Sequence, residues 1–401
     1  MKVVRMSQVV DTVSDLVQLR RWTLSVLQVA PGRDAAVPAA AFPAVSPQGL
    51  PIFLSAERCA APLAECLARA RTSARIPLDA IATIESTAMD DANHVLRAER
   101  EAREIGTLLS AQDQSAIVLK GGVAAVLRAS PPVTLHDVDL LVTTGARKHL
   151  EQILDARGFT AADADEAHHR CWYPPAGHLP VEIHWTTHND GQPENPAVWR
   201  RAIPLGTAPG LEMLDWSDQV IHLIRHAIEH HNDRHVTIRD LFLTGWVASH
   251  LSQEELESIR KAIETSRDPQ RSNAFLDFSR AVYTGQRMSD PFENDAILHF
   301  AAAVLLQQGP LWSGGPSPVW HNAAAVAAGV MSVSQLVSFA GRNPVTGIDA
   351  FQAFQRRAPS VGALLTRSAR AAHYFGSTLI GVPLLRTIRS RVHKRLANPL
   401  S

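Results

Sequence analysis

The chain has 401 residues, of which 46% are hydrophobic and 19% are charged. This composition is typical of a globular protein, it excludes an intrinsically disordered chain, and the length allows two or three domains. Lysine plus arginine and aspartate plus glutamate both number 39, so the net charge gives no indication of a polyanionic partner.

The N-terminal part of the chain is predicted to be helical. One helix is expected over 13–29, a Pro/Ala-rich linker or irregular wrapped segment over 31–51, and two or three helices over 55–112. We find neither a secretory leader pattern nor an apolar run of about 18 residues, so we expect a cytoplasmic protein without a transmembrane helix.

A small α/β unit is predicted to follow. The expected elements are a strand at 117–119, a turn at Gly121-Gly122, a helix from Val123, a strand around Asp139, a helix over 147–157, an acidic loop over 159–169, and paired strands at 171–173 and 181–185. The predicted fold class is therefore α+β, with a small mixed sheet embedded in a mostly helical chain.

From Asp215 the pattern is helical almost to the end of the chain. We divide the sequence into an N-terminal helix with the Pro/Ala-rich segment (1–54), a helical region (55–112), the α/β core (113–210), a helical domain (211–345) and a basic helical tail (346–401). The tail has no acidic residue after Asp349, and Leu385, Ile388, Val392 and Leu396 recur at helical spacing between arginines. This pattern fits a helix that docks its apolar stripe on the protein, or one that contacts an anionic surface.

Three carboxylates carry the main indication of chemistry. Asp137 and Asp139 are two residues apart in a strand, so their side chains share one face and repel each other unless a cation lies between them. Mg²⁺ is the usual cation for such a pair, and Glu182 in a second apolar strand could add a third carboxylate. The alternatives are a solvated strand edge for the aspartates and a surface glutamate paired with arginine. The apolar flanks of Asp139 favour the metal site.

A glycine turn precedes these carboxylates. Gly121 and Gly122 would let the backbone approach a phosphate at the start of the following helix, and Lys120 could add a positive charge. The alternative is an ordinary strand-to-helix turn.

Together, Leu119-Lys120-Gly121, Asp137 to Val142 and Val181 to Trp185 resemble motifs of the uncharacterised nucleotidyltransferase family of bacterial proteins. This family is related to the DNA polymerase β-like nucleotidyltransferase superfamily. A histidine followed by an Arg-x-x-Asp-Leu-like segment also recurs in the family, and His226, Arg239 and Asp240 are the candidates here. The sequence departs from the pattern in two ways: Gly121-Gly122 replaces Gly-Ser, and Val133 to His136 lacks an arginine before the aspartates.

The resemblance implies transfer of a nucleoside monophosphate from an NTP such as ATP to an unidentified small molecule or peptide. Asp137 and Asp139 would bridge two Mg²⁺ ions, with Mn²⁺ as a substitute, and Glu182 would help to hold the second ion. Lys120, Gly121, Gly122 and His184 would contact the nucleotide.

Two other functions stay open. His222, His226 and His230 recur every four residues, which predicts one helix face and suggests a metal-dependent hydrolase that also uses Asp233 or Asp240. These histidines could equally pack around the nucleotide. The second alternative is a catalytically inactive nucleotidyltransferase-fold binding module, which the Gly-Gly turn favours.

Overall fold

A computed structural model gives the structure of the protein. It describes residues 6–28, 41–46, 49–69, 76–127, 134–162, 168–187, 194–230, 235–308 and 383–397.

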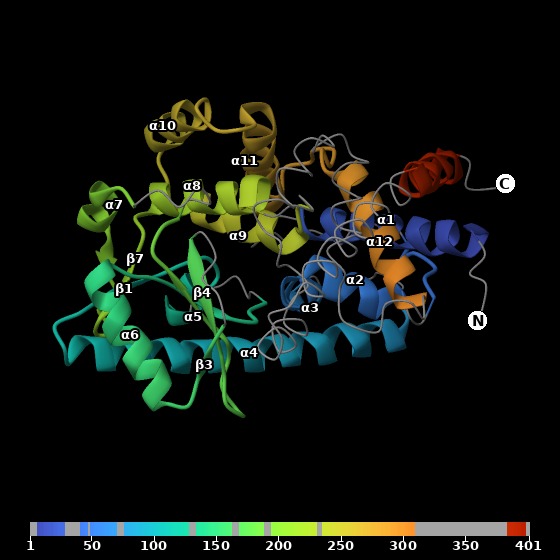
Figure 1. Ribbon diagram of the computed structural model, residues 1–401. Coiled ribbons are helices and arrows are strands. Elements are labelled where there is room, and N and C mark those ends of the chain that lie inside the picture. The colour runs from blue at the N-terminus through green and yellow to red at the C-terminus, as the bar shows by residue number, and fades with distance from the viewer. Residues whose placement is uncertain are drawn as a thin grey trace, which may run out of the picture.

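A mixed sheet lies in one half of the described molecule, and α1, α2 and α12 lie in the other half (Figure 1). Its seven strands lie in the order β3-β4-β5-β2-β1-β7-β6: β1 (Ala116–Val118), β2 (Val138–Leu141), β3 (Thr160–Ala161), β4 (His169–Tyr173), β5 (Val181–His184), β6 (Ile203–Pro204) and β7 (Leu211–Met213). β1 is antiparallel to β2 and parallel to β7, and β2 is parallel to β5. The predicted class, a small mixed sheet within a mostly helical chain, is confirmed.

Helices make up most of the rest of the described chain. They are α1 (Met6–Leu27), α2 (Gly49–Glu57), α3 (Ala60–Arg69), α4 (Leu78–Ser110), α5 (Gly122–Leu127), α6 (Thr144–Ala156), α7 (Pro196–Arg201), α8 (Trp216–Arg225), a π-helical turn (His226–His230), α9 (Ile238–Ala248), α10 (Gln253–Ile263), α11 (Pro269–Thr284), α12 (Glu293–Gln308) and residues 383–397.

Different helices cover the two faces of the sheet. Helix α4 runs beneath both the sheet and α2–α3, whereas α8 and α9 lie on the other side of the sheet (Figure 1). The approach of α4 is close, because a Cβ on Gly106 would lie 2.6 Å from Leu211 Cγ. Ile117 and Leu141 pack toward Trp199 of α7 on the face opposite to Leu140. Since side chains alternate along a strand, Asp139 lies on this α7-facing side of the sheet.

Several predicted elements differ from the structure at the sheet edges. The predicted loop 159–169 contains β3 and the first residue of β4, and we did not predict β6 or β7. β3 and β6 are two residues long and β7 is three. Strands this short carry too few alternating residues to be recognised, and they form because a neighbouring strand supplies hydrogen-bond partners.

A buried charge network joins the N-terminal helices to α9. Arg20 of α1 donates to both carboxylate oxygens of Glu57 at 2.7 and 2.6 Å and to Asp290 Oδ2 at 2.7 Å. Glu57 also accepts from Ile238 N at 2.8 Å, and His235 Nε2 lies 3.2 Å from its other oxygen. The side chains of Arg20 and Glu57 are only 1% and 0% exposed.

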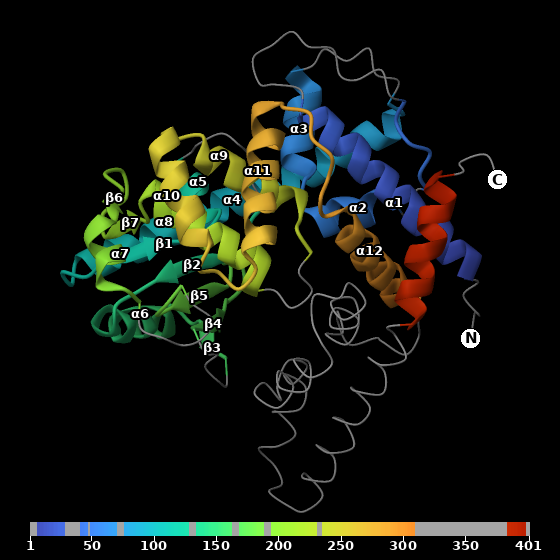
Figure 2. The ribbon, with the colours of Figure 1, turned by 90° about the horizontal axis from the view of Figure 1, so that it is seen from above.

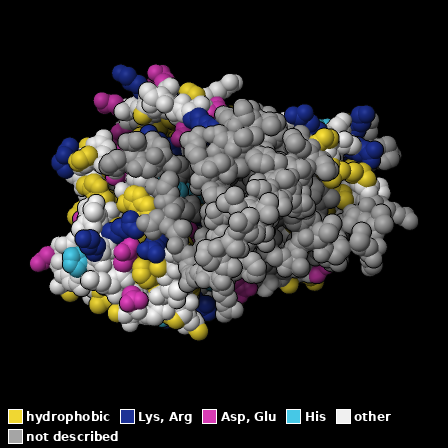
Figure 3. Space-filling model, in the orientation of Figure 1, with side chains coloured by type: hydrophobic (Ala, Val, Ile, Leu, Met, Phe, Trp, Pro, Cys, Tyr) yellow, Lys and Arg dark blue, Asp and Glu magenta, His cyan; other side chains and the backbone are white. Residues whose placement is uncertain are grey.

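The last described helix packs on this N-terminal half. Leu385, Ile388 and Val392 are fully buried, and the helix lies beside α1 and α12 (Figure 2). Lys and Arg side chains gather on the outer surface of this helix (Figure 3). The docked apolar stripe therefore agrees with one of the two predictions for 383–397, while 346–382 lie outside the described residues. None of the described helices combines the length and hydrophobicity needed to cross a membrane.

Candidate active site

Strand pairing brings two of the three predicted carboxylates together. β2 and β5 are parallel with Asp139 opposite Glu182, although 43 positions separate these residues in the sequence. Asp139 is only 4% exposed, and Asp137 lies directly before β2 and is half-buried. The structure therefore has a carboxylate cluster on one face at the middle of the sheet.

Lys120 reaches into this cluster from the turn after β1. Its Nζ lies 2.8 Å from Asp139 Oδ1 and 4.0 Å from Glu182 Oε2. The backbone of Lys120 is left-handed, with φ of 52°, a conformation that is uncommon and costly for a non-glycine residue. The turn is tied to β2 because Leu119 N donates to Asp139 O at 3.0 Å.

Gly122 is required by the close packing of this turn. A Cβ at Gly122 would lie 2.7 Å from Val118 Cγ1, a distance that forces Val118 to move. The turn thus brings the start of α5 directly onto β1, next to Lys120.

His184 approaches the same carboxylates from the end of β5. Its Nε2 lies 2.9 Å from Asp139 Oδ1 and 3.5 Å from Glu182 Oε2. Burial lowers the pKa of His184, but the hydrogen bonds to Asp139 and Glu182 outweigh this and leave the pKa raised. The Lys120 ammonium and the His184 imidazole therefore converge on one oxygen of Asp139.

The two aspartates are in opposite electrostatic states. Burial and the charge of Asp139 raise the pKa of Asp137 to about 6. Burial also acts to raise the pKa of Asp139, but Lys120 and His184 hold it well below its usual range. Lys120 and His184 thus stabilise the ionised form of Asp139, whereas the ionised form of Asp137 is less well stabilised.

This donor set fits a divalent cation. Ligand atoms of Asp139, Glu182 and His184 all lie within 4.8 Å of one another, and Asp137 adds a carboxylate whose ionisation needs further positive charge. Mg²⁺ is commonly held by one or two carboxylates together with substrate phosphates. Lys120 Nζ and His184 Nε2 both contact Asp139 Oδ1, so a cation at this carboxylate would bind Oδ2 or displace Lys120.

Arg239 lies near the carboxylates, whereas Asp240 caps the start of α9. Arg239 is 8% exposed, its Nε has no hydrogen-bond partner among the described residues, and its charge acts on both Asp137 and His136. Asp240 accepts from Thr237 Oγ1 at 2.8 Å and completes a capping box at the start of α9. Asp240 is therefore engaged in helix capping.

The predicted histidine face lies only partly on an α-helix. Helix α8 ends at Arg225, and His226–His230 form a π-helical turn, so four-residue spacing no longer keeps side chains in register from His226 onward. The rings of His222 and His226 are 6.3 Å apart. Among the described residues, no third ligand joins these two histidines in a metal-binding group. The side chain of His230 and residue Asp233 lie outside the described residues.

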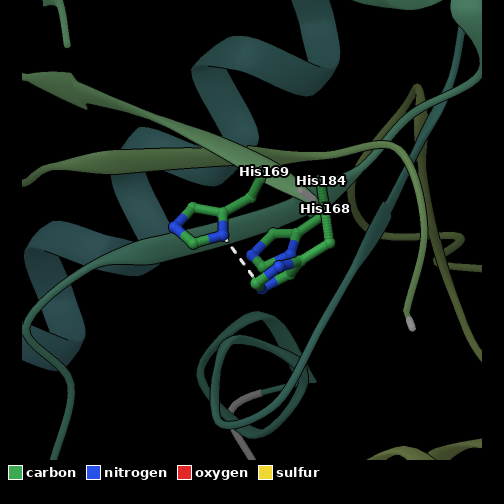
Figure 4. Close-up of side chains that lie close together, drawn as sticks. All are labelled: His168, His169 and His184. Atoms are coloured by element: carbon green, nitrogen blue, oxygen red, sulfur yellow. Dashed lines mark hydrogen bonds between the residues drawn. The ribbon is translucent and has the colours of Figure 1, made fainter. Parts of the chain in front are cut away.

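Sequence reasoning missed a different histidine cluster at the site. His168 and His169, at the start of β4, lie beside His184 (Figure 4). Burial, together with the neighbouring positive groups, lowers the pKa of His168 to about 2. Burial also lowers the pKa of His169, to about 4, although Glu182 acts to raise it. The adjacent His-His pair, opposite His184 in a predicted hairpin, was the available signal.

A pocket of about 190 Å³ lies between α7, α8 and the segment after β5. Its wall includes Glu194, Arg201, Asp218, His222 and Arg225. His222 also contributes to lowering the pKa of His168, so this wall lies within electrostatic range of the histidine cluster.

Comparisons with known proteins place these features in context. A family model described as "Uncharacterised nucleotidyltransferase" matches residues 45–259, which is more than half of the chain. The search of curated proteins found no match to this chain. Among solved structures, the solution structure of the antibiotic-resistance factor ANT(2'')-Ia is similar at 15% sequence identity and a TM-score of 0.30, covering 45% of this chain and 92% of that one. At this TM-score the likeness carries no weight for fold or function.

Proposed function

Because the chain belongs to the uncharacterised nucleotidyltransferase family, we propose that it transfers a nucleoside monophosphate from an NTP to an acceptor at the Asp137–Asp139–Glu182 cluster. The observation that carries the proposal is the parallel pairing of β2 with β5, which sets Asp139 opposite Glu182 with Lys120 Nζ beside both. Both metal ions of the predicted two-Mg²⁺ reaction, or Mn²⁺ in their place, would be held by these carboxylates.

The side chains around the cluster have distinct roles in this proposal. Mg²⁺ bound here supplies positive charge to the triphosphate and to the acceptor oxygen. Lys120 leaves Asp139 when the nucleotide enters and then binds a phosphate, because an ammonium group pairs with either anion. Gly121 directly precedes α5 and Gly122 is its first residue, so their backbone N–H groups would contact the same phosphates.

Arg239 and His184 complete the nucleotide site. Arg239 is a buried cation near Asp137, so it supplies charge for the triphosphate that the segment before Asp137 lacks. His184 donates from Nε2 to Asp139 and holds that carboxylate in place. The acceptor, a small molecule or peptide, binds in the pocket between α7 and α8, whose wall carries both Arg225 and Glu194.

Calorimetric titration of ATP, GTP, CTP and UTP with Mg²⁺ tests the proposal. We expect the wild type to bind at least one of these nucleotides only when Mg²⁺ is present, and Asp139→Asn to lose this binding because the cation loses a charged ligand. Asp155→Asn, on the exposed side of α6, is the control and should bind as the wild type does.

Binding that persists without Mg²⁺, or that is equal in the wild type and Asp139→Asn, would contradict the proposal. The first result would instead favour a binding module that has lost turnover.

The affinity for Mg²⁺ and nucleotide should depend on pH through Asp137. Its pKa is raised to about 6, so protons compete with the cation below that pH. We expect the affinity to rise with pH up to about 6 and then to level off, in titrations from about pH 5 to about pH 8. Asp137→Asn should bind Mg²⁺ and nucleotide more weakly, and its affinity should not show this rise with pH. A wild-type affinity that is constant across the range would show that Asp137 does not bind the cation.

A further inference from the structure

Three imidazoles from two neighbouring strands converge beside the carboxylate cluster. β4 and β5 are antiparallel, with His169 directly opposite His184. His168 precedes β4, and its carbonyl accepts a hydrogen bond from Trp185 N at 3.1 Å, which holds it next to the end of β5. Figure 4 shows the three rings grouped together.

The nitrogen atoms of this group are close enough to share one ion. His169 Nδ1 lies 2.9 Å from His168 Nε2, and each of the three residues offers a ring nitrogen within 4.8 Å of the others. Two nitrogens bound to one tetrahedral Zn²⁺ at 2.0–2.1 Å are about 3.3 Å apart. Small rotations of the rings would therefore bring the nitrogens to ligand distances.

Two of the rings also approach carboxylates. His184 Nε2 donates to Asp139 Oδ1 at 2.9 Å, which leaves Nδ1 as the nitrogen with a free lone pair. His169 Nε2 lies farther from a carboxylate, 4.0 Å from Glu182 Oε1 and beyond hydrogen-bond distance, while its Nδ1 faces His168. Histidines that bind metals usually donate their other N–H to a carboxylate, as His184 does, which fixes the ring and increases its basicity.

We propose that His168, His169 and His184 form a binding site for a divalent transition-metal ion of the Zn²⁺ or Co²⁺ type. Imidazole ligands select such ions, whereas Mg²⁺ prefers the oxygen ligands of the neighbouring cluster. Three protein ligands leave one coordination position for water or a substrate atom. The ion would also fix His184, and through it the orientation of Asp139. This site shares His184 and its partner Asp139 with the proposed nucleotide site, but its occupancy is measured without nucleotide and does not rest on the proposed function.

Metal titration of protein that carries no histidine tag tests the site. We expect one equivalent of Zn²⁺ to bind in competition with a chromogenic chelator, and one equivalent of Co²⁺ to give a visible absorption spectrum of nitrogen coordination. The His168→Phe/His169→Gln double variant should bind Zn²⁺ at least about 100-fold more weakly and lose the Co²⁺ spectrum. Asp139→Asn should weaken binding by about 10- to 100-fold, because His184 loses its carboxylate partner.

Two further variants control the experiment. His149→Ala, on α6, removes a histidine that contacts Gly145 O and belongs to no candidate metal group among the described residues, and it should leave Zn²⁺ binding unchanged. His222→Phe/His226→Gln removes the pair on α8 and the π-helical turn and should also retain it. Circular dichroism and urea unfolding establish that each variant is folded.

Retention of Zn²⁺ by the His168/His169 variant, or its loss from the His222/His226 variant, would overturn the proposal. Absence of stoichiometric binding by the wild type would do the same. None of these results depends on nucleotide binding, so the proposed nucleotidyl transfer stands or falls separately.

Discussion

Glu57→Gln is expected to lower the free energy of unfolding by about 3–5 kcal/mol, the usual cost of removing one partner from a buried ion pair. Glu57 faces Arg20 and His235 in a region that is closed to water, and Arg20 and Asp290 would remain there without it. Burial acts to raise the pKa of Glu57, but Arg20 and His235 lower it to about 2. This carboxylate therefore contributes stability at neutral pH that is lost as the pH falls below about 4.5 toward 2.

The next residue of α1 provides a matched control. Arg21 pairs with Glu293, but the Arg21 side chain is 49% exposed, so this ion pair is solvated. Glu293→Gln should change the free energy of unfolding by no more than about 1 kcal/mol. Urea denaturation of the wild type and both variants measures the difference. Equal losses in the two variants would show that the buried network contributes nothing beyond an ordinary surface pair.

The Glu57 network also concerns the active site. Glu57 accepts from Ile238 N, and Ile238 directly precedes Arg239, the buried cation near Asp137. The N-terminal helices thus fix the position where α9 starts. A folded Glu57→Gln protein should bind Mg²⁺ and nucleotide more weakly than the wild type, because Arg239 is held less firmly.

Lys120→Met is expected to make the stability of the protein strongly dependent on Mg²⁺. In the wild type, Lys120 Nζ lies 2.8 Å from Asp139 Oδ1 and compensates this carboxylate. Without the ammonium group, Asp137, Asp139 and Glu182 repel one another, and the metal-free variant should lose about 3–5 kcal/mol of stability. Mg²⁺ should restore a large part of this loss, because it supplies the positive charge that Lys120 no longer provides. At 100 times its dissociation constant, the ion adds about 2.7 kcal/mol.

Urea unfolding with and without Mg²⁺ measures both effects. Lys148→Met, which removes an exposed lysine of α6, is the control and should respond to Mg²⁺ as the wild type does. A Lys120→Met protein whose stability does not change with Mg²⁺ would show that the carboxylate cluster does not bind the ion.

Local patterns were sufficient to predict the central elements of the fold. Apolar residues around Asp139 and Glu182 predicted β2 and β5, and the glycines after Lys120 predicted the turn into α5. These predictions succeed because a buried strand or a tight turn requires particular residue types within a few positions. The roles of Asp137, Asp139, Glu182, Lys120, Gly121, Gly122 and His184 in catalysis and nucleotide binding stay predictions.

Local patterns failed where distant residues decide the structure. β7 exists because β1 pairs with it, and the turn after α8 is π-helical, which the four-residue recurrence of His222 and His226 did not indicate. Arg20 and Asp290 are 270 positions apart, so no sequence window contains their ion pair.

The sequence by itself therefore determined which segments form the sheet centre and which residue types it carries, because strand periodicity and turn chemistry are local properties. Only the tertiary structure decided that Asp139 lies opposite Glu182, that Lys120 and His184 share one carboxylate oxygen, and that His168 and His169 join His184. The physical reason is strand register. Which residues meet across a sheet depends on the burial of whole strands, and a shift by one residue would turn each side chain to the other face.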